Sequence, residues 1–291
     1  MTATLIDGKA VAAAQRQRIA TEVTALGAQG VTPGLAAVLV GDDPASHVYV
    51  GMKEKDCAAV GITSLGARLP ADVDQATLHA EIDRLNADPA VSGIIVQMPL
   101  PGHLDEIAAQ DRIDPVKDVD GLGPASQGPI MRGIPTYVPA TPLGCRVLLE
   151  HHDVPLAGAE VVVVGRSTLV GRPLAMLLSL KGTDATITMC HSRTRDLAAH
   201  TRRADVVVMA VGVPRMLTAD MVKPGACVLD VGITRDEESG SLIGDVDFDA
   251  VVEVAGLLTP VPGGIGPMTR AMLLENTLRA ARTIAGLPAA P

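Results

Sequence analysis

The 291-residue sequence contains few aromatic residues: two Tyr, one Phe and no Trp. It also lacks any apolar stretch of the ~18–20 residues that a membrane-spanning helix needs. Its N-terminal segment has no basic region followed by an apolar run, so we expect no signal peptide. The longest apolar runs, such as VVVMAVGV at 206–213, have the length of a buried strand.

Paired cysteines are missing as well. The four cysteines are far apart in the sequence and form no C-x-x-C pair; they are Cys57, Cys145, Cys190 and Cys227. Free cysteine usually behaves as a small buried apolar residue. We therefore interpret these residues as reduced thiols, which is typical of a cytoplasmic protein.

An excess of positive charge is also absent, because the formal net charge is −9. Nucleic acids and anionic membranes need a basic surface, so the sequence argues against both as main partners. A local basic pocket for a phosphate stays possible. The length suffices for two hydrophobic cores, and the 29 Gly and 21 Pro indicate a turn-rich folded protein.

Hydrophobic patterns predict an α/β protein with two domains. Helical and strand patterns alternate, which indicates βαβ units and parallel sheets. A Pro/Gly-rich passage at 114–142 has little periodicity and is predicted to be a functional loop. We place one domain at 1–141 with the C-terminal helix at 265–291, and a second at 142–264. The predicted helices are 9–27, 42–61, 74–87, one starting after Pro142 and one ending near 285. In the second of them, Asp42 or Asp43 would cap the start, Pro44 suits the first turn and Gly61 would end the helix. The predicted strands are 34–41, 93–101, 160–165, 185–190, 205–212 and 226–232.

In the second domain, VVVVGRSTLVGRPLAMLL at 161–178 reads as strand, tight glycine turn and helix. Such a turn presents backbone N–H groups at a helix N-terminus, which suits a pyrophosphate. The spacing is not G-x-G-x-x-G: five residues separate Gly165 from Gly171, and Ser167 stands where a second glycine is expected. An ordinary turn without a ligand is the alternative.

The following strand favours NADP over NAD. An acidic residue at its end would hold the ribose 2′-hydroxyl of NAD. Here the strand ends in Cys190, followed by His191, Ser192 and Arg193, and Arg166 adds a cation in the first loop. Cations and a hydroxyl suit a 2′-phosphate. The alternative is that these are solvated loop charges.

Two further strand ends, AVGVP at 210–214 and DVGIT at 230–234, carry glycines. Glycine at the carboxyl edge of a parallel sheet allows a cofactor to approach closely. We expect Ile233 to pack on the nicotinamide side, although its position alone would equally make it a core residue.

In the first domain, Ser46, Tyr49 and Lys53 fall on one face of the predicted helix at ~100° per residue, and Lys55 points away. A lysine in a partly apolar cleft has a lowered pKa and suits acid–base chemistry. The neighbouring Tyr49 ring offers a surface for stacking a flat heterocycle. The alternative is an exposed lysine beside a core tyrosine.

Three further elements complete the candidate site. Gln97 follows the strand GIIV and can accept a hydrogen bond from an ammonium group. Asp120, in KDVDG, can accept two N–H bonds from an amidine-like ring edge, although Asp118 and Asp120 both also suit a turn. PVPGGIGP at 260–267, with Pro262 and Gly263, offers a rigid main chain for a ligand to lie against.

Together these segments resemble the bifunctional methylenetetrahydrofolate dehydrogenase/methenyltetrahydrofolate cyclohydrolase family. The resemblance covers nearly the whole chain in the family's order, and S-x-x-Y-V-x-x-K and P-V-P-G-G-x-G-P-M-T are its most specific motifs. The segments are VGDDPASHVYVGMKEKDCAAVGI, GIIVQMPLP, DPVKDVDG, VVVVGRSTLVGRP, DVGIT and PVPGGIGPMTRAMLLENT.

The resemblance implies two α/β domains, the second with a Rossmann-like parallel sheet, and an active-site cleft between them. It implies NADP-dependent oxidation of 5,10-methylenetetrahydrofolate to the 5,10-methenyl form, then hydrolysis to 10-formyltetrahydrofolate. This one-carbon chemistry supplies purine biosynthesis. It further implies a cytoplasmic homodimer with tetrahydrofolate derivatives as ligands and no metal.

The resemblance also implies roles for individual residues. Lys53 would be the acid–base of the hydrolysis, Gln97 would orient it, Tyr49 would stack on the folate, and Asp120 would hold the pterin edge. Pro262 and Gly263 would line the folate site. The residues that match the family's NADP positions are Gly165, Arg166, Ser167, Ser192 and Ile233, and we add Arg193.

The sequence departs from the family pattern at two positions. Met52 stands where a small polar residue often precedes the lysine, and Ile265 replaces the commoner Val. Neither change removes a group that the chemistry needs. Two other readings remain open: another NADP dehydrogenase acting on a small hydroxy or amino acid, and a non-enzymatic NADP-binding protein.

Overall fold

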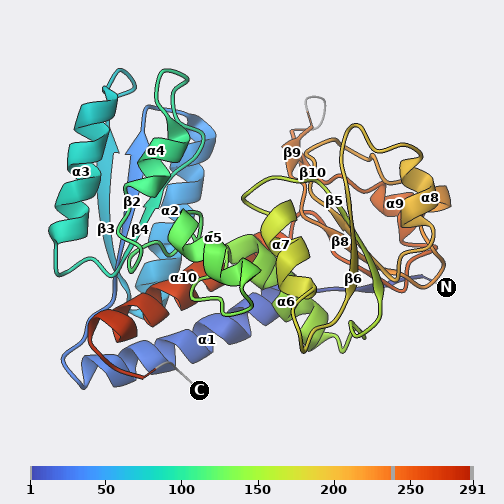
Figure 1. Cartoon of the computed structure of the whole chain (residues 1–291), viewed down its shortest axis with the longest axis horizontal. Coiled ribbons are helices and arrows are strands. Elements are labelled where there is room, and N and C mark those ends of the chain that lie inside the picture. Colours follow the sequence, from blue (N-terminus) through green and yellow to red (C-terminus); the bar gives the residue numbers. More distant parts are fainter. Residues whose placement is uncertain (1, 237–239, 289–291) are drawn as a thin grey trace. The chain divides into compact units, whose positions relative to one another are not determined.

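The computed structural model describes residues 2–236 and 240–288, and the chain divides into two compact units (Figure 1). The small-sheet unit comprises Ala13–Pro129, Pro135–Ala140 and Arg270–Pro291. The large-sheet unit comprises Met1–Ala12, Ile130–Ile134 and Thr141–Thr269. Both units combine parallel strands with helices, which confirms the predicted fold class.

The small-sheet unit contains a three-stranded parallel sheet with the order β3-β2-β4. Helix α2 packs against β2 and β3, and α3 packs against α4 (Figure 1). The strands are β2 (Gly34–Val40), β3 (Thr63–Leu69) and β4 (Gly93–Val96). The helices are α2 (Pro44–Val60), α3 (Gln75–Ala87), α4 (Glu106–Asp111) and α5 (Pro124–Met131). Helices α1 (Gly8–Gly27) and α10 (Ile265–Ile284) begin in the large-sheet unit and end in this one.

Helix α2 begins and ends where its sequence predicts. The Asp43 carboxylate accepts a hydrogen bond from the Ser46 N–H at 2.7 Å, and Pro44 occupies the first turn. Gly61 ends the helix with a φ of 81°, a left-handed conformation that glycine adopts without strain. This helix is therefore fixed at both ends, which matters because it carries Tyr49 and Lys53.

The passage at 114–142 is not the unstructured loop that the sequence predicts. Residues Pro124–Met131 form α5, whose Pro and Gly content conceals the helical pattern. Earlier in the passage, Asp118 forms a parallel bridge with Ile94, so the chain runs beside β4. Strand β3 also escaped prediction, because it is an edge strand in which exposed and half-buried residues alternate.

The large-sheet unit contains a six-stranded sheet with the order β1-β11-β8-β7-β5-β6, and every pairing in it is parallel. Four strands match the predicted positions: β5 (Glu160–Val164), β6 (Thr186–Cys190), β7 (Val206–Met209) and β8 (Cys227–Asp230). The remaining strands are β11 (Leu257–Leu258), β1 (Thr4–Leu5) and the antiparallel pair β9 (Thr234–Arg235) and β10 (Leu242–Ile243). The helices are α6 (Ala140–His151), α7 (Gly171–Leu178), α8 (Leu197–Thr201), the 3-10 helix η1 (Ala219–Met221) and α9 (Phe248–Val251).

The N-terminal strand joins the large sheet rather than the small one. Thr4 and Leu5 pair with Leu257 and Leu258 of β11. A two-residue strand leaves almost no sequence pattern, so its partner was not predictable. The compact units group Met1–Ala12, Ile130–Ile134 and residues 265–269 with the large sheet, whereas the predicted domains place these residues with the small one.

All four cysteines are buried and free, as expected for reduced thiols. Burial raises the pKa of Cys57, Cys145 and Cys227 to about 12, so these thiols stay protonated near neutral pH. Within the described parts of the chain, no helix is both long and apolar enough to cross a bilayer.

Lys117 fixes the start of the passage that carries Asp120. Its Nζ donates hydrogen bonds to the carbonyl oxygens of Leu85, Asn86 and Asp88 at 3.2, 2.7 and 2.8 Å. These carbonyls lie at the C-terminal end of α3, where a helix exposes unpaired acceptors and favours a cation.

The substitution Lys117→Met removes the donor from three carbonyls. We expect it to lower the free energy of unfolding by about 1–3 kcal/mol, the cost of leaving buried polar groups unpaired. Denaturant unfolding measures this effect, with Lys55→Met, at an exposed position, as the control. Equal stabilities of the two variants would contradict this role for Lys117.

Candidate functional site

The residues predicted to bind a dinucleotide lie in loops at the carboxyl edge of the large sheet. Val164 pairs with both Cys190 and Met209, and Met209 pairs with Asp230. Since parallel strands end at the same edge, the four loops that follow them emerge side by side. These loops are 165–170, 191–196, 210–214 and 231–233.

The glycine turn lies where the strand order reverses. From β5 the chain passes to β6 on one side and then to β7 on the other, and ligands of open α/β sheets bind at such a point. A Cβ on Gly165, whose φ is 125°, would lie 2.2 Å from the Ala210 carbonyl oxygen. A Cβ on Gly171 would lie 2.2 Å from the Gly165 carbonyl oxygen. Both glycines are therefore required for close packing of this turn.

Ser167 replaces the second glycine with a hydroxyl group that holds the turn. Its Oγ accepts hydrogen bonds from the N–H groups of Val170 at 3.1 Å and Gly171 at 3.5 Å. Arg166 and Ser167 are exposed in the loop that leads into α7. A helix N-terminus with an adjacent guanidinium suits a pyrophosphate, so this turn fits the dinucleotide that the sequence predicts.

The loop after β6 is held by its own hydrogen bonds. The His191 N–H donates to Thr194 Oγ1 at 2.9 Å, and the Arg193 N–H donates to His191 Nδ1 at 3.1 Å. Ser192 and Arg193 are exposed. The next acid, Asp196, caps α8 by accepting from the Ala199 N–H at 3.1 Å. The loop thus presents a hydroxyl and a cation, which fits a 2′-phosphate.

Two buried aspartates that the sequence analysis missed support the remaining loops. Asp245 Oδ2 accepts hydrogen bonds from the N–H groups of Val211 at 2.7 Å and Gly212 at 3.0 Å. Asp230 accepts from the N–H groups of Gly232 at 3.2 Å, Asp245 at 2.9 Å and Val246 at 3.0 Å. These bonds fix the loops at 210–214 and 231–233, which carry Gly212 and Gly232.

The environment of Asp230 is unusual for a carboxylate. Burial raises its pKa to about 6, although three N–H donors oppose this shift. Glycine is required at position 232, beside Asp230 and Asp245, because a Cβ there would lie 2.1 Å from Asp245 Oδ1. Asp230 is the first residue of DVGIT, so the motif was visible in the sequence, but the prediction used only its glycine and isoleucine.

The structure brings Lys53 and Gln97 together in the small-sheet unit. Lys53 Nζ donates a hydrogen bond to Gln97 Oε1 at 3.1 Å. Gln97 Nε2 donates to the Met98 carbonyl oxygen at 2.7 Å, which turns the amide oxygen toward the lysine. Lys53 is half-buried, whereas Tyr49 is 38% exposed. The burial is thus the reverse of an exposed lysine beside a core tyrosine.

The two aspartates of KDVDG have different surroundings. The Asp118 carboxylate accepts hydrogen bonds from the N–H groups of Gly121 at 3.1 Å and Gly123 at 2.9 Å, and from Ser126 Oγ at 2.6 Å. Asp118 is therefore the turn residue. Asp120 interacts electrostatically with Lys53.

Burial and charge act in opposite directions on this pair. Burial lowers the pKa of Lys53 below its ordinary value, and the Asp120 carboxylate partly restores it. Burial raises the pKa of Asp120, and the Lys53 ammonium opposes that shift. A lysine with a lowered pKa exchanges a proton more readily near neutral pH, which is the property that acid–base catalysis needs.

The remaining predicted residues lie in the large-sheet unit. Pro262 and Gly263 precede α10, and Gly263 has a φ of 121° that only glycine adopts readily. Ile233 is 39% exposed, so it is not a core residue.

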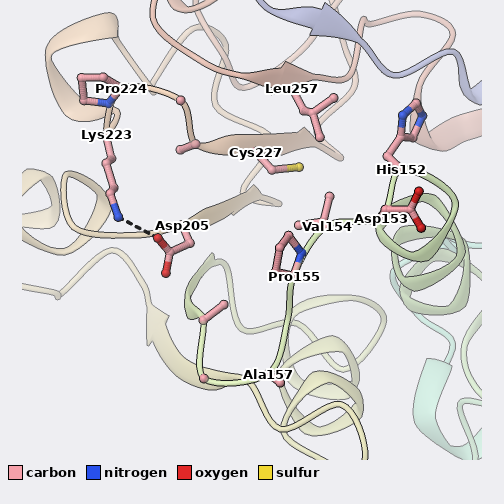
Figure 2. Close-up of a pocket in the computed structure, with 14 residues that line it drawn as sticks. His152, Asp153, Val154, Pro155, Ala157, Asp205, Lys223, Pro224, Cys227 and Leu257 are labelled. Atoms are coloured by element: carbon pink, nitrogen blue, oxygen red, sulfur yellow. Dashed lines mark hydrogen bonds and ion pairs between the residues drawn. The ribbon is translucent and has the colours of Figure 1, made fainter.

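The cavity drawn in Figure 2 lies at the opposite edge of the large sheet. It has a volume of about 550 Å³, and Cys227 and Leu257, the first residues of β8 and β11, line it. Lys223 Nζ forms an ion pair with Asp205 Oδ1 at 2.7 Å beside it (Figure 2). Since dinucleotides bind at the carboxyl edge, this cavity is separate from the candidate cofactor site.

The fold and the glycine turn define a dinucleotide-binding α/β protein, and the half-buried lysine adds a group suited to proton transfer. Two family models match the chain. Residues 6–120 match the catalytic domain of tetrahydrofolate dehydrogenase/cyclohydrolase, and residues 139–285 match its NAD(P)-binding domain. The chain therefore belongs to the tetrahydrofolate dehydrogenase/cyclohydrolase family, which confirms the resemblance seen in the sequence.

Similar proteins agree with this assignment. The chain is 58% identical to bifunctional protein FolD 2 of Frankia alni over 286 residues, covering 98% of each chain. It is 55% identical to bifunctional protein FolD of Bordetella avium over 281 residues, covering 97% of this chain and 98% of that one.

Solved structures give the same result. The bifunctional enzyme FolD of Campylobacter jejuni superposes with a TM-score of 0.94 at 44% identity, covering 96% of this chain and 99% of that one. The FolD enzyme of Trypanosoma brucei, solved with NADP cofactor and an inhibitor, superposes with a TM-score of 0.93 at 40% identity, covering 97% and 98%.

The substitution Gly171→Ala tests the glycine turn. The new Cβ would displace the Gly165 carbonyl and distort the turn. A strain of about 1–3 kcal/mol implies a fall in NADP affinity of roughly 5- to 150-fold. Calorimetric titration with NADP measures this. Gly128→Ala is the matched control, because no atom lies within 4 Å of its Cβ position. Equal affinities in both variants would contradict this role for the turn.

Proposed function

We propose that this chain oxidises 5,10-methylenetetrahydrofolate with NADP and hydrolyses the resulting 5,10-methenyl cation to 10-formyltetrahydrofolate. The observation that carries the proposal is the hydrogen bond from Lys53 Nζ to Gln97 Oε1 at 3.1 Å, beside the charge of Asp120. Family membership supplies the two reaction types. The arrangement of Lys53, Gln97 and Asp120 supports a role for these residues in the hydrolysis.

Hydrolysis requires a water molecule to attack the methenyl carbon and lose a proton. The neutral Lys53 amine accepts that proton as the carbon–oxygen bond forms. Gln97 holds the amine in place, since its own amide is fixed by the Met98 carbonyl. The bond between this carbon and N5 then breaks as N5 takes up a proton and the new hydroxyl group loses one, which gives the 10-formyl product. One proton is released overall.

Oxidation depends on alignment rather than on a side-chain base. Bound NADP supplies the hydride acceptor. The lone pair on the substrate nitrogen expels the hydride. The protein therefore has to hold the nicotinamide ring and the folate ring system in the orientation that hydride transfer needs. We assign stacking of the folate to the exposed Tyr49 ring and recognition of the pterin edge to Asp120. Pro262 and Gly263 are assigned as further folate contacts.

The cofactor assignment rests on the loops at the carboxyl edge of the large sheet. Gly165 and Ser167 are assigned to the pyrophosphate, and Arg166, Ser192 and Arg193 to the 2′-phosphate. Ile233 is assigned to the nicotinamide side. Residues 142–264 are thus proposed as the NADP-binding domain, with 1–141 and 265–291 binding the folate.

We also propose that the protein works as a cytoplasmic homodimer. The buried free thiols support a reducing compartment. Size-exclusion chromatography with light scattering tests the dimer.

Lys53→Met tests the acid–base assignment. We expect cyclohydrolase activity to be lost, while part of the dehydrogenase activity remains because oxidation needs no side-chain base. The measurement follows reduced NADP and methenyl product together, and methenyl accumulation is the expected signature. Lys55→Met is the matched control with both activities retained. Unchanged cyclohydrolase turnover in Lys53→Met would refute the assignment.

Arg193→Ser tests the choice of cofactor. Loss of a charged hydrogen bond to the 2′-phosphate should weaken NADP binding by about 1.5–3 kcal/mol, or roughly 10- to 100-fold. Activity with NAD, which lacks that phosphate, serves as the internal control and should change little. An equal loss with both cofactors would assign Arg193 a general structural role instead.

A further inference from the structure

Arg270 contacts helix α2 on both sides of Lys53. Its Nε forms an ion pair with Asp56 Oδ2 at 2.6 Å, and its Nη1 donates to Met52 Sδ at 3.2 Å. The side chains of Arg270 and Asp56 are only 25% and 16% exposed, so the pair is largely shielded from water. The contact joins α10 to the turn of α2 that carries the lysine.

The sequence positions bring this ion pair close to the helix turn that carries Lys53. Met52 directly precedes Lys53, and Asp56 follows it by three residues. Residues three apart on a helix are surface neighbours, with Cβ atoms ~5–6 Å apart. Met52 is also a position at which the sequence departs from the family pattern. The Met52 thioether is a weak acceptor that reaches the Arg270 guanidinium. A short polar side chain at this position would not extend far enough to make that contact.

Charges on every element around Lys53 must be considered together. Helix α2 contributes Asp56, the protonated thiol of Cys57 and Glu54, which forms an ion pair with Arg68 of β3 at 3.5 Å. Helix α10 contributes Arg270. The loop before α5 contributes Asp120, and the residue after β4, Gln97, is neutral. Because Asp56 and Arg270 are paired, their fields at the lysine largely cancel, and removal of either partner leaves one uncompensated charge.

We propose that the Arg270–Asp56 ion pair positions Lys53 and balances the charge beside it, and so sets the pH range of the cyclohydrolase step. The inference rests on the proposed role of Lys53 as the acid–base. Arg270 and Asp56 are positioning residues, since they act through the lysine.

The two partners have effects of opposite sign. In Arg270→Met, the unpaired Asp56 carboxylate favours the ammonium form and raises the pKa of Lys53. The pH–rate profile then moves to higher pH, because the neutral amine appears later. In Asp56→Asn, the unpaired guanidinium disfavours the ammonium form, and the profile moves to lower pH. We expect each shift to be about 0.5–1 pH unit.

The experiment measures cyclohydrolase rate against pH with 5,10-methenyltetrahydrofolate, after subtraction of the uncatalysed rate. Dehydrogenase activity is recorded in parallel. Arg270→Lys and Asp56→Glu preserve the charges and should restore profiles near that of the unmodified protein. Arg112→Met breaks an exposed ion pair with Asp83 elsewhere in the small-sheet unit, and it should leave the profile unchanged.

Opposite shifts in Arg270→Met and Asp56→Asn, with a near-normal profile in the double variant, would support the inference. Shifts in the same direction, or no shift in either variant, would overturn it. Lys53→Met separates this result from the proposed function. If that variant keeps its cyclohydrolase activity, the proposed function fails. If it loses the activity while both ion-pair variants keep normal profiles, only the inference about Arg270 and Asp56 fails.

Discussion

Desolvation of the Lys53 amine is the constraint on which the candidate acid–base site of the small-sheet unit depends. Burial alone would lower the pKa of this group, and a carboxylate in contact would cancel much of the effect. The structure provides an intermediate case, in which Asp120 acts on the amine through its field while Gln97 supplies the neutral hydrogen-bond acceptor. A neutral acceptor holds the amine in place without strongly favouring its charged form.

A similar arrangement supports one loop in each unit. In both loops a buried carboxylate accepts several hydrogen bonds, mostly from backbone N–H groups. Asp118 holds the turn at 121–126, and Asp245 holds the loop at 211–212. Such charge-assisted bonds are stronger than bonds between neutral groups, and they leave the loop's outer surface free for a ligand. Rigid support of this kind keeps a glycine-rich segment in one conformation despite its intrinsic freedom.

Local sequence patterns predicted the features that depend on local physics. The ends of α2 followed from Pro44, Gly61 and an aspartate cap at 42 or 43, which the structure shows to be Asp43. Strands β5 to β8 followed from their apolar runs. The shared helix face placed Tyr49 and Lys53 correctly on α2. Other features were missed because they depend on distant partners. Strand β1 pairs with a segment some 250 residues away, and Arg270 contacts Asp56 across 214 positions.

Pairing also explains why an additional ion pair beside Lys53 is compatible with a lowered lysine pKa. A single buried charge would dominate the field at the amine, whereas Arg270 and Asp56 together contribute a dipole that falls off faster with distance. The pair can therefore fix α10 to α2 without imposing a net charge on the site. Its geometry adds rigidity because the guanidinium binds two side chains of α2, one before the lysine and one after it. The turn that carries Lys53 is consequently held from both ends, which limits the positions its amine can adopt relative to Gln97.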